Sequence, residues 1–308
     1  MTASRIPVTL LSGFLGAGKT TLLQRILTQT AGRRIAVIEN EFGSVNVDRL
    51  LLEGTSNTVF QLQNGCLCCS VYDDLIDALQ RMIDRHPDLE HLIIEATGLA
   101  DPAPVIAGMS APGIREHFEL AGVITMVDAA HLHANLADTE VCARQIALAD
   151  VLVVNRIDQV PPSALHDLQP VLRSLNPLAS YHATTHAQID VAMALAHHRT
   201  EMKATPITHH HHDSRIGSLA LEAEGTIDID AIDQWLGAVV RRHEILRMKG
   251  VLVIPNDPRR FVFQGVRQWV DVHPHTEWGD APKLNQLVFI GRDLHEQALR
   301  EGFASCVM

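Results

Sequence analysis

The first half of the chain alternates short apolar runs with segments of helical periodicity. Near-continuous apolar runs predict strands buried on both faces, at residues 6–12, 34–38, 58–62, 91–94, 121–127 and 151–154. Apolar residues at three- and four-residue spacing predict helices at about 20–28 and 73–84. This alternation predicts an α/β domain with a mostly parallel sheet that helices cover on both faces.

The second half has a different pattern. One face of a predicted helix carries the apolar residues Ile232, Leu236, Val239 and Val240. Strand-like segments are predicted at 250–254, 260–265, 268–272 and 285–291, and a closing helix at 294–303. Strands grouped in series predict a smaller α+β domain with a mostly antiparallel sheet.

A His-rich stretch separates the two patterns. Eight histidines lie between residues 182 and 212, and the last four are consecutive. We interpret residues 206–214 as a linker between a first domain at 1–205 and a C-terminal domain at 215–308. His209, His210, His211 and His212 could hold zinc weakly, as a collecting arm, or could simply be solvated linker residues.

Composition and charge narrow the class of protein. The chain has 308 residues, of which 46% are hydrophobic and 20% charged, so it can bury a sizeable core. No apolar run reaches the roughly 18 residues that a membrane-spanning helix needs, and residues 1–5 lack a secretory pattern. The net charge of −11 argues against non-specific nucleic-acid binding. We therefore expect a soluble cytoplasmic protein with neither membrane nor nucleic acid as a partner.

A phosphate-binding loop follows the first predicted strand. The sequence Gly13-Phe-Leu-Gly-Ala-Gly-Lys-Thr20 matches the Walker A pattern, which opens a helix after a strand. Lys19 can reach the β- and γ-phosphates, and the Thr20 hydroxyl can bind Mg²⁺. The residues expected to surround the phosphates are Gly13, Gly16, Ala17, Gly18, Lys19, Thr20 and Thr21.

Two further segments extend this site. Glu95-Ala-Thr-Gly98 follows a buried strand, so Glu95 can hold Mg²⁺ directly or through water, and Gly98 can offer its N–H to the γ-phosphate. Asn155-Arg-Ile-Asp158 resembles the guanine-reading motif N-K-x-D, with Arg156 in place of lysine. Asp158 can accept from two guanine donors, whereas adenine would leave a buried carboxylate unpaired. Asn155 either ties this loop to the phosphate loop or contacts the base. GTP is the expected nucleotide, and ATP remains the alternative.

Three of the five cysteines fall within four positions, at Cys66, Cys68 and Cys69. An odd number of cysteines cannot pair completely, and without an export signal clustered thiols are more typical of a metal site than of disulfides. Thiolates suit Zn²⁺ and Cu(I), and two or three of these thiols can face one ion. Cys142 and Cys306 are interpreted as structural. The pairs His131/His133 and His273/His275 would share a strand face if they lie in strands, but are more typical of ordinary histidines.

Taken in order, these motifs resemble those of the CobW-type GTPases. The resemblance includes the phosphate loop, Val37-Ile-Glu-Asn-Glu-Phe-Gly43, the C-x-C-C turn and Glu95-Ala-Thr-Gly98. It continues in the C-terminal half with Arg247-Met-Lys-Gly250, Phe263-Gln-Gly265, Trp278-Gly279 and Val288-Phe-Ile-Gly291.

The resemblance implies a GTPase that delivers zinc to a client metalloprotein. It makes Cys66, Cys68 and Cys69 the transferable zinc site, with Glu39 and Glu41 completing the metal shell on the segment that responds to nucleotide. Lys19, Thr20 and Glu95 become the catalytic residues, with GTP, Mg²⁺ and Zn²⁺ as ligands. Two alternatives stay open: a nucleotide-binding protein that stores or senses zinc, and a cobalt-handling protein of corrinoid synthesis.

Overall fold

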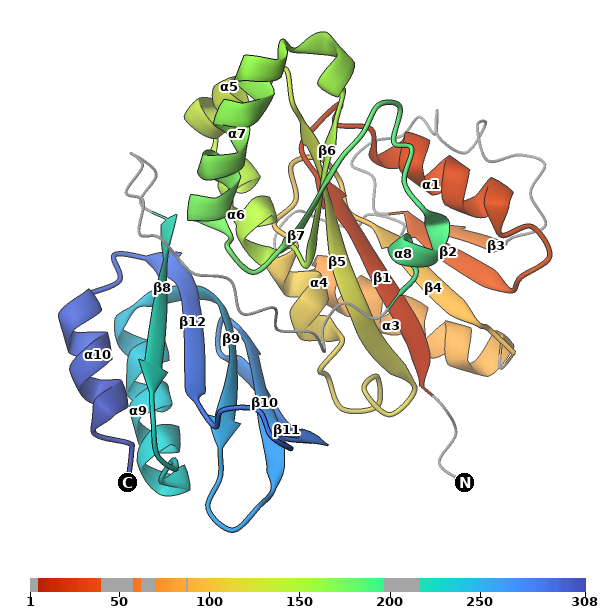
Figure 1. Cartoon of the computed structure of the whole chain (residues 1–308). Coiled ribbons are helices and arrows are strands. Elements are labelled where there is room, and N and C mark those ends of the chain that lie inside the picture. Colours follow the sequence, from red (N-terminus) through yellow and green to blue (C-terminus); the bar gives the residue numbers. More distant parts are fainter. Residues whose placement is uncertain (1–4, 40–57, 62–69, 87, 197–215) are drawn as a thin grey trace. The chain divides into compact units, whose positions relative to one another are not determined.

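A computed structural model describes residues 5–39, 58–61, 70–86, 88–196 and 216–308. The chain divides into two compact units, one formed by Met1–Leu168 with Ala179–Arg199 and the other by Gln169–Leu178 with Thr200–Met308. Figure 1 shows the elements of both units along the chain. Among the described residues, no helix is both long enough and apolar enough to cross a membrane.

The first unit is built on a parallel sheet. In the described part of the chain, seven strands lie in the order β3-β2-β4-β1-β5-β6-β7, and each neighbouring pair is parallel. The strands are β1 (Ile6–Gly13), β2 (Ile35–Glu39), β3 (Thr58–Gln61), β4 (His91–Glu95), β5 (Phe118–Asp128), β6 (Val151–Asn155) and β7 (Ser180–Ala183). The predicted parallel α/β fold is confirmed. Only β7 was missed, because its four residues are polar or small and do not form an apolar run.

Helices lie on both faces of this sheet (Figure 1). Those of the first unit are α1 (Lys19–Gln29), α3 (Ser70–Arg85), α4 (Ala103–Gly108), α5 (Leu132–Asp138), α6 (Glu140–Leu148), the 3₁₀ helix η1 (Ile157–Gln159) and α8 (Val191–Ala194). The helix α7 (Pro162–Leu175) contributes residues to both units. The two helices that the sequence predicted here, α1 and α3, are confirmed.

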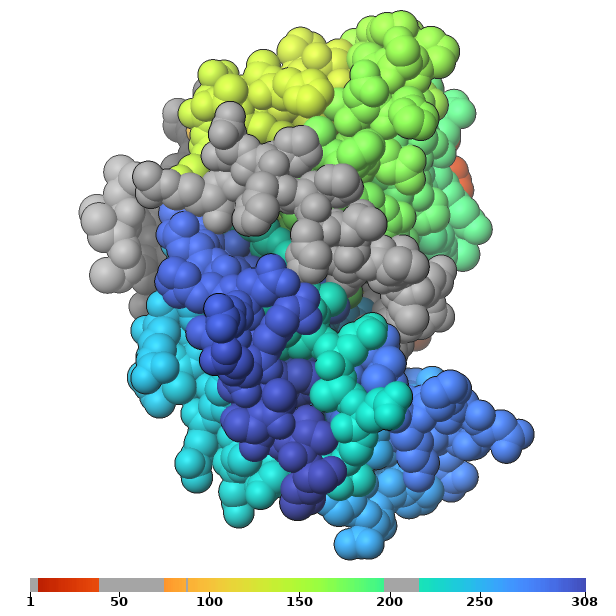
Figure 2. All heavy atoms as spheres, turned by 60° about the vertical axis from the view of Figure 1, so that its left-hand side comes forward, coloured from red at the N-terminus to blue at the C-terminus, as the bar shows by residue number. Residues whose placement is uncertain are grey.

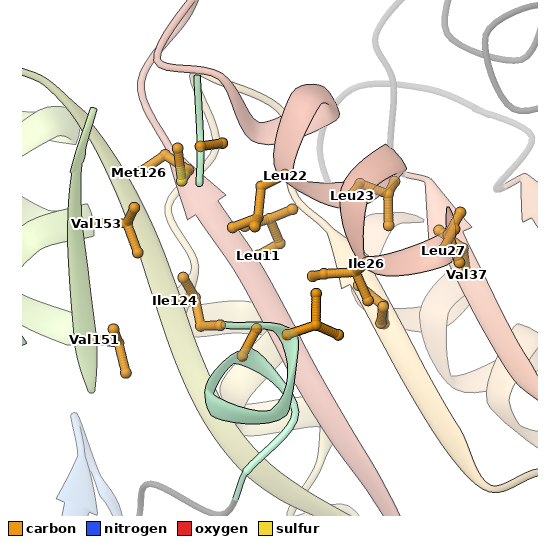
Figure 3. Packing of buried hydrophobic residues seen from close by; sticks show 14 of the residues in the cluster. Leu11, Leu22, Leu23, Ile26, Leu27, Val37, Ile124, Met126, Val151 and Val153 are labelled. Atoms are coloured by element: carbon orange, nitrogen blue, oxygen red, sulfur yellow. The ribbon is translucent and has the colours of Figure 1, made fainter. Parts of the chain in front are cut away.

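The core beneath α1 fixes where this helix begins. Its apolar residues Leu22, Leu23, Ile26 and Leu27 form one stripe and are almost fully buried. They pack against a sheet face that includes Leu11, Ile124 and Met126 (Figure 3). Burial of each leucine or isoleucine contributes about 1.5–3 kcal/mol. The stripe therefore holds the first turn of α1 at the carboxyl end of β1, where the phosphate loop connects them.

The second unit contains an antiparallel sheet in the order β11-β10-β9-β12-β8. Its described elements are β8 (Ile216–Ala223), α9 (Ile229–Arg242), β9 (Glu244–Val253), β10 (Arg259–Val266), β11 (Trp269–Glu277), β12 (Asn285–Arg292) and α10 (Glu296–Ala304). Trp235 of α9 packs on Phe289 and Phe303. The helix α10 contacts β8 and α9, and Figure 2 shows its dark-blue atoms beside teal ones. The predicted antiparallel α+β domain is confirmed.

One strand of this unit was missed, and two strand predictions need correction. The strand β8 was not predicted, although alternation of Leu219 and Leu221 is a signal that could have located it. The strand β9 begins at Glu244 rather than at 250, because backbone pairing with β10 and β12 holds Arg247 and Lys249 in the strand. Pairing with β10 likewise extends β11 to Glu277, beyond the short apolar run that predicted it.

Candidate nucleotide site

The loop between β1 and α1 requires glycine at several positions. Gly13, Gly16 and Gly18 have φ angles of +138°, +72° and +105°, which L side chains rarely adopt. A Cβ atom at Gly13 would lie 2.4 Å from the Met126 carbonyl oxygen, and one at Gly18 would lie 2.6 Å from Asn155 Nδ2. The loop backbone therefore lies against β5 and β6, in the shape of a cradle whose N–H groups can surround a phosphate.

Lys19 places a cation at this cradle. The residue is only 9% exposed, and its Nζ donates to the carbonyl oxygens of Gly13 (2.9 Å) and Phe14 (3.2 Å). The residue also begins α1, with Gly18 in the left-handed conformation before it. The ammonium group and the positive end of the helix dipole thus act at the same loop.

Thr20 and Glu95 meet at the carboxyl edge of the sheet. The Thr20 hydroxyl donates to Glu95 Oε1 at 3.3 Å, because the parallel register places Glu95 beside Leu11 in β1. Nearby in sequence, the buried Thr97 hydroxyl has no hydrogen-bond partner within the described ranges. Hydroxyl and carboxylate oxygens are the ligands that Mg²⁺ prefers, so this donor set fits a magnesium ion.

Gly98 lies directly against the phosphate loop. A Cβ atom there would come within 2.5 Å of Leu15 Cδ2 and 2.8 Å of Leu15 Cα. Because a backbone atom is among these neighbours, no simple side-chain movement would make room for a larger residue. Because Gly98 has no side chain, the segment after β4 can lie next to the phosphate loop.

Asn155 connects three loops at the other end of the site. Its Nδ2 donates to the Ala17 carbonyl oxygen at 3.0 Å, and its Oδ1 accepts from the Ala187 N–H at 3.0 Å. The tie to the phosphate loop, one of the two roles considered from the sequence, is therefore present. The sequence analysis did not identify the segment after β7 as part of the site. In the structure, His186 and Ala187 of this segment both adopt positive φ angles. Arg25 Nη2 also donates to the His186 carbonyl oxygen at 3.3 Å, and the sequence carried no local signal of this contact.

Arg156, which stands in place of the lysine of the guanine motif, forms an ion pair with an acidic residue. Arg156 adopts a left-handed φ of 61°, and its Nη1 forms an ion pair with Asp128 Oδ2 at 2.8 Å. Asp128 also accepts from His131 Nδ1 at 3.1 Å. Asp158, in η1, is exposed rather than buried, so any burial of its carboxylate has to come from the nucleotide itself.

Comparison with known proteins decides the family. The CobW/HypB/UreG nucleotide-binding domain matches residues 7–183, and the cobalamin synthesis protein CobW C-terminal domain matches residues 216–307. The chain belongs to the CobW family. The resemblance inferred from the motifs is thus confirmed, and the CobW assignment covers both structural units.

Individual CobW relatives match over nearly the whole chain. The zinc chaperone YjiA of Escherichia coli (strain K12) is 34% identical over 313 residues, which cover 97% of this chain and 98% of its own. The zinc chaperone CobW of Sinorhizobium sp is 32% identical over 348 residues, with 98% of each chain covered. A crystal structure of Zn(II)-bound YjiA GTPase from E. coli superposes with a TM-score of 0.79 and 29% identity, covering 99% of this chain and all of that one.

Most of the predicted zinc residues of this CobW chain lie outside the described residues. This holds for Glu41, for Cys66, Cys68 and Cys69, and for the run His209–His212. Of Glu39 only the backbone is described, at the end of β2, where it pairs in register with Glu95. Within the described ranges, no group of three or more His, Cys, Asp or Glu side chains is arranged to hold a metal.

The two histidine pairs considered from the sequence lie in different kinds of secondary structure. His131 and His133 lie at the start of α5, so the strand arrangement considered for this pair is wrong. His273 and His275 both lie in β11, where His273 Nδ1 lies 3.1 Å from Asp271 Oδ2 and His275 Nδ1 lies 3.2 Å from the Thr276 hydroxyl.

The two described cysteines are expected to be unreactive in the native protein. Burial raises the pKa of Cys142 to about 12 and also raises the pKa of Cys306. Only roughly 10⁻⁵ of a thiol with that higher pKa is ionised at neutral pH, and the thiolate is the nucleophile. Mass spectrometry after brief iodoacetamide treatment should find both unmodified until denaturant is added. A Cys142→Ala control should leave the native labelling pattern unchanged, and rapid native labelling of Cys142 would contradict the expectation.

Proposed function

We propose that the protein is a GTP-hydrolysing zinc chaperone that carries zinc on Cys66, Cys68 and Cys69 and transfers it to a client metalloprotein. The observation that carries the proposal is the meeting of Thr20 with Glu95 beside the Lys19 cradle. The CobW family and relatives named zinc chaperones support the metal assignment. The proposed organisation is a GTPase domain at 1–205, a linker at 206–214 and a C-terminal domain at 215–308.

The proposed reaction converts GTP and water to GDP and phosphate. Lys19 neutralises negative charge that develops around the β- and γ-phosphates, and the loop N–H groups hold the same oxygens. Thr20 and Glu95 would hold Mg²⁺, and the ion would supply further positive charge to the phosphate oxygens. Gly98 offers its N–H to the γ-phosphate. Lysine and loop amides of this kind act by fixed electrostatics, so their effect is greatest on the transition state.

Guanine selection is assigned to the loop after β6. The Asp158 carboxylate accepts from the two guanine N–H donors, which adenine lacks. Asn155 keeps this loop at a fixed distance from the phosphate loop through its bond to Ala17. The Asp128 ion pair anchors Arg156 and so orients the stem that replaces the usual lysine.

Sheet register supports a link between the nucleotide and the proposed zinc site. Glu39 pairs with both Glu95 and Gln61 at the carboxyl edge. Cys66 follows Gln61 by five positions, a span of at most about 18 Å, and Cys69 immediately precedes α3. Zinc is the cargo, and Glu39 and Glu41 are proposed to complete its shell. The run His209–His212 is proposed as a weaker collecting arm, because the entropy lost when the residues of the proposed linker are ordered around an ion would oppose binding.

An Asp158→Asn variant tests the assignment to GTP. The asparagine amide keeps one acceptor but adds a donor, so one guanine N–H loses its acceptor. Xanthine carries an oxygen in place of the guanine 2-amino group, and this oxygen gains the amide as a donor. We expect GTP affinity to fall by about tenfold, equivalent to one charge-assisted hydrogen bond of roughly 1.5 kcal/mol, and affinity for xanthosine triphosphate to rise. Binding of GTP, ATP and xanthosine triphosphate would be measured by calorimetry.

Asp190→Asn is the matched control, since Asp190 is an exposed carboxylate that caps α8. It should leave all three nucleotide affinities within about twofold of wild type, as surface substitutions usually do. An unchanged preference for GTP over ATP in Asp158→Asn would place guanine recognition on other residues. A wild-type preference for ATP would overturn the GTPase proposal itself.

A further inference from the structure

A buried glutamine of α6 holds the segment that follows Glu95. Gln145 is 1% exposed, and its Nε2 donates to the carbonyl oxygens of Gly98 and Ala100, both at 3.1 Å. Its Oε1 is buried and has no hydrogen-bond partner among the described residues. The amide group therefore serves this segment as a donor to two carbonyls that are two residues apart.

The same segment is fixed at two further points. On one side, Gly98 lies so close to Leu15 that a Cβ atom would be 2.8 Å from Leu15 Cα. On the other, Arg144 Nη1 forms an ion pair with Asp101 Oδ2 at 3.3 Å. Asp101 Oδ1 in turn accepts from the Ala103 N–H at 2.9 Å, at the start of α4. Neighbouring residues of α6 thus hold both ends of the short segment from Gly98 to Asp101.

These contacts fix the backbone conformation of Gly98, which a glycine cannot fix by itself. A residue without Cβ populates a wide range of φ and ψ angles, so its neighbours must select one. The hydrogen bond to the Gly98 carbonyl oxygen restrains ψ at Gly98, and the approach of Leu15 limits the position of its Cα. A buried carbonyl that loses its donor would move to find another partner.

We propose that Gln145 is a positioning residue for the γ-phosphate. By fixing the Gly98 backbone against the phosphate loop, it pre-organises the N–H that meets the γ-phosphate of GTP and has no counterpart to meet in GDP. The inference rests on the proposed nucleotide site and deepens it. Gln145 therefore sets the ratio of GTP affinity to GDP affinity, in addition to any contribution to stability.

The test compares wild type with Gln145→Met, which keeps the length and approximate volume of the side chain but removes both donors. Affinities for GDP and for a non-hydrolysable GTP analogue are measured by calorimetry, and turnover by phosphate release. We expect affinity for the analogue and kcat each to fall by about tenfold, the effect of losing roughly one well-placed hydrogen bond. GDP affinity should stay within about twofold.

Thr125→Val is the matched control for a purely structural role. The Thr125 hydroxyl donates to the backbone carbonyl of Gln145 at 2.9 Å and is buried, so this variant disturbs α6 without removing the amide donors. We expect its Tm to fall while the ratio of the two nucleotide affinities stays at the wild-type value. A second variant, Asp101→Asn, keeps the cap on Ala103 but weakens the pairing with Arg144, and should lower analogue affinity by about twofold to threefold.

The outcomes separate the inference from the proposed function. A wild-type protein that binds neither guanine nucleotide would overturn the proposed function. If wild type binds both, but Gln145→Met lowers Tm without changing the ratio of the affinities, Gln145 is only structural and the inference is wrong. If Gln145→Met does not fold, an unchanged ratio in Asp101→Asn overturns it in the same way.

Discussion

Replacing Lys19 with alanine is expected to lower GTP turnover by at least about a hundredfold. The side chain places a buried cation at the phosphate loop, bonded to the carbonyl oxygens of Gly13 and Phe14. Removal of one pre-organised donor that stabilises developing charge costs about 10²–10³ in kcat. Phosphate release at saturating GTP would be measured for both proteins, together with melting curves to show that the variant is folded.

Lys283→Ala is a suitable control, because it removes one positive charge at an exposed position of the second unit. It should leave turnover unchanged, which would separate the loss of a specific contact from a change in net charge. If folded Lys19→Ala protein hydrolyses GTP at the wild-type rate, the phosphate loop is not the catalytic site.

Replacing Cys66, Cys68 and Cys69 together with serine is expected to lower zinc affinity by more than a hundredfold. Loss of groups that merely support metal ligands already costs about 10–100-fold, so removal of three thiolate ligands should cost more. Competition with a chromophoric chelator would measure the affinity. The wild-type affinity should rise as pH is raised through the thiol titration, because binding displaces thiol protons, and the serine variant should lose that dependence.

Cys142→Ala serves as the control here, since it removes a buried thiol whose pKa of about 12 makes it a poor ligand. It should bind zinc as tightly as wild type. Zinc affinity that survives in the triple variant would remove the C-x-C-C turn from the metal site and favour the run His209–His212 instead.

The same titration tests whether nucleotide and zinc are linked. Coupling free energies between sites are typically 1–3 kcal/mol, so zinc affinity should differ by roughly 5- to 150-fold between GDP and a non-hydrolysable GTP analogue. Linkage requires zinc to change the relative affinity for the two nucleotides by the same factor. During turnover, zinc should pass to the chelator faster than in GDP alone. Equal zinc affinities in both nucleotide states would reject nucleotide-switched zinc affinity and leave client docking as the only possible switch.

The sequence determined the features that depend on neighbouring residues. Apolar runs located the first six strands of the parallel sheet, because a strand covered on both faces needs continuous hydrophobic residues. The glycines, Lys19 and Thr20 of the phosphate loop were recognisable because the Walker A pattern lies within eight consecutive residues. Strands in series also sufficed to predict the antiparallel C-terminal sheet.

Tertiary structure decided which distant residues meet. Asn155 reaches Ala17 across 138 positions, Arg156 reaches Asp128 across 28, and Gln145 reaches Gly98 across 47. None of these pairs has a local signature, because each depends on the order of strands in the sheet and on how the helices cover it. The sequence analysis missed the polar strand β7 and predicted β11 too short, also because long-range pairing decides them. Their backbone pairing with a neighbouring strand, rather than their own apolar pattern, holds them in the sheet.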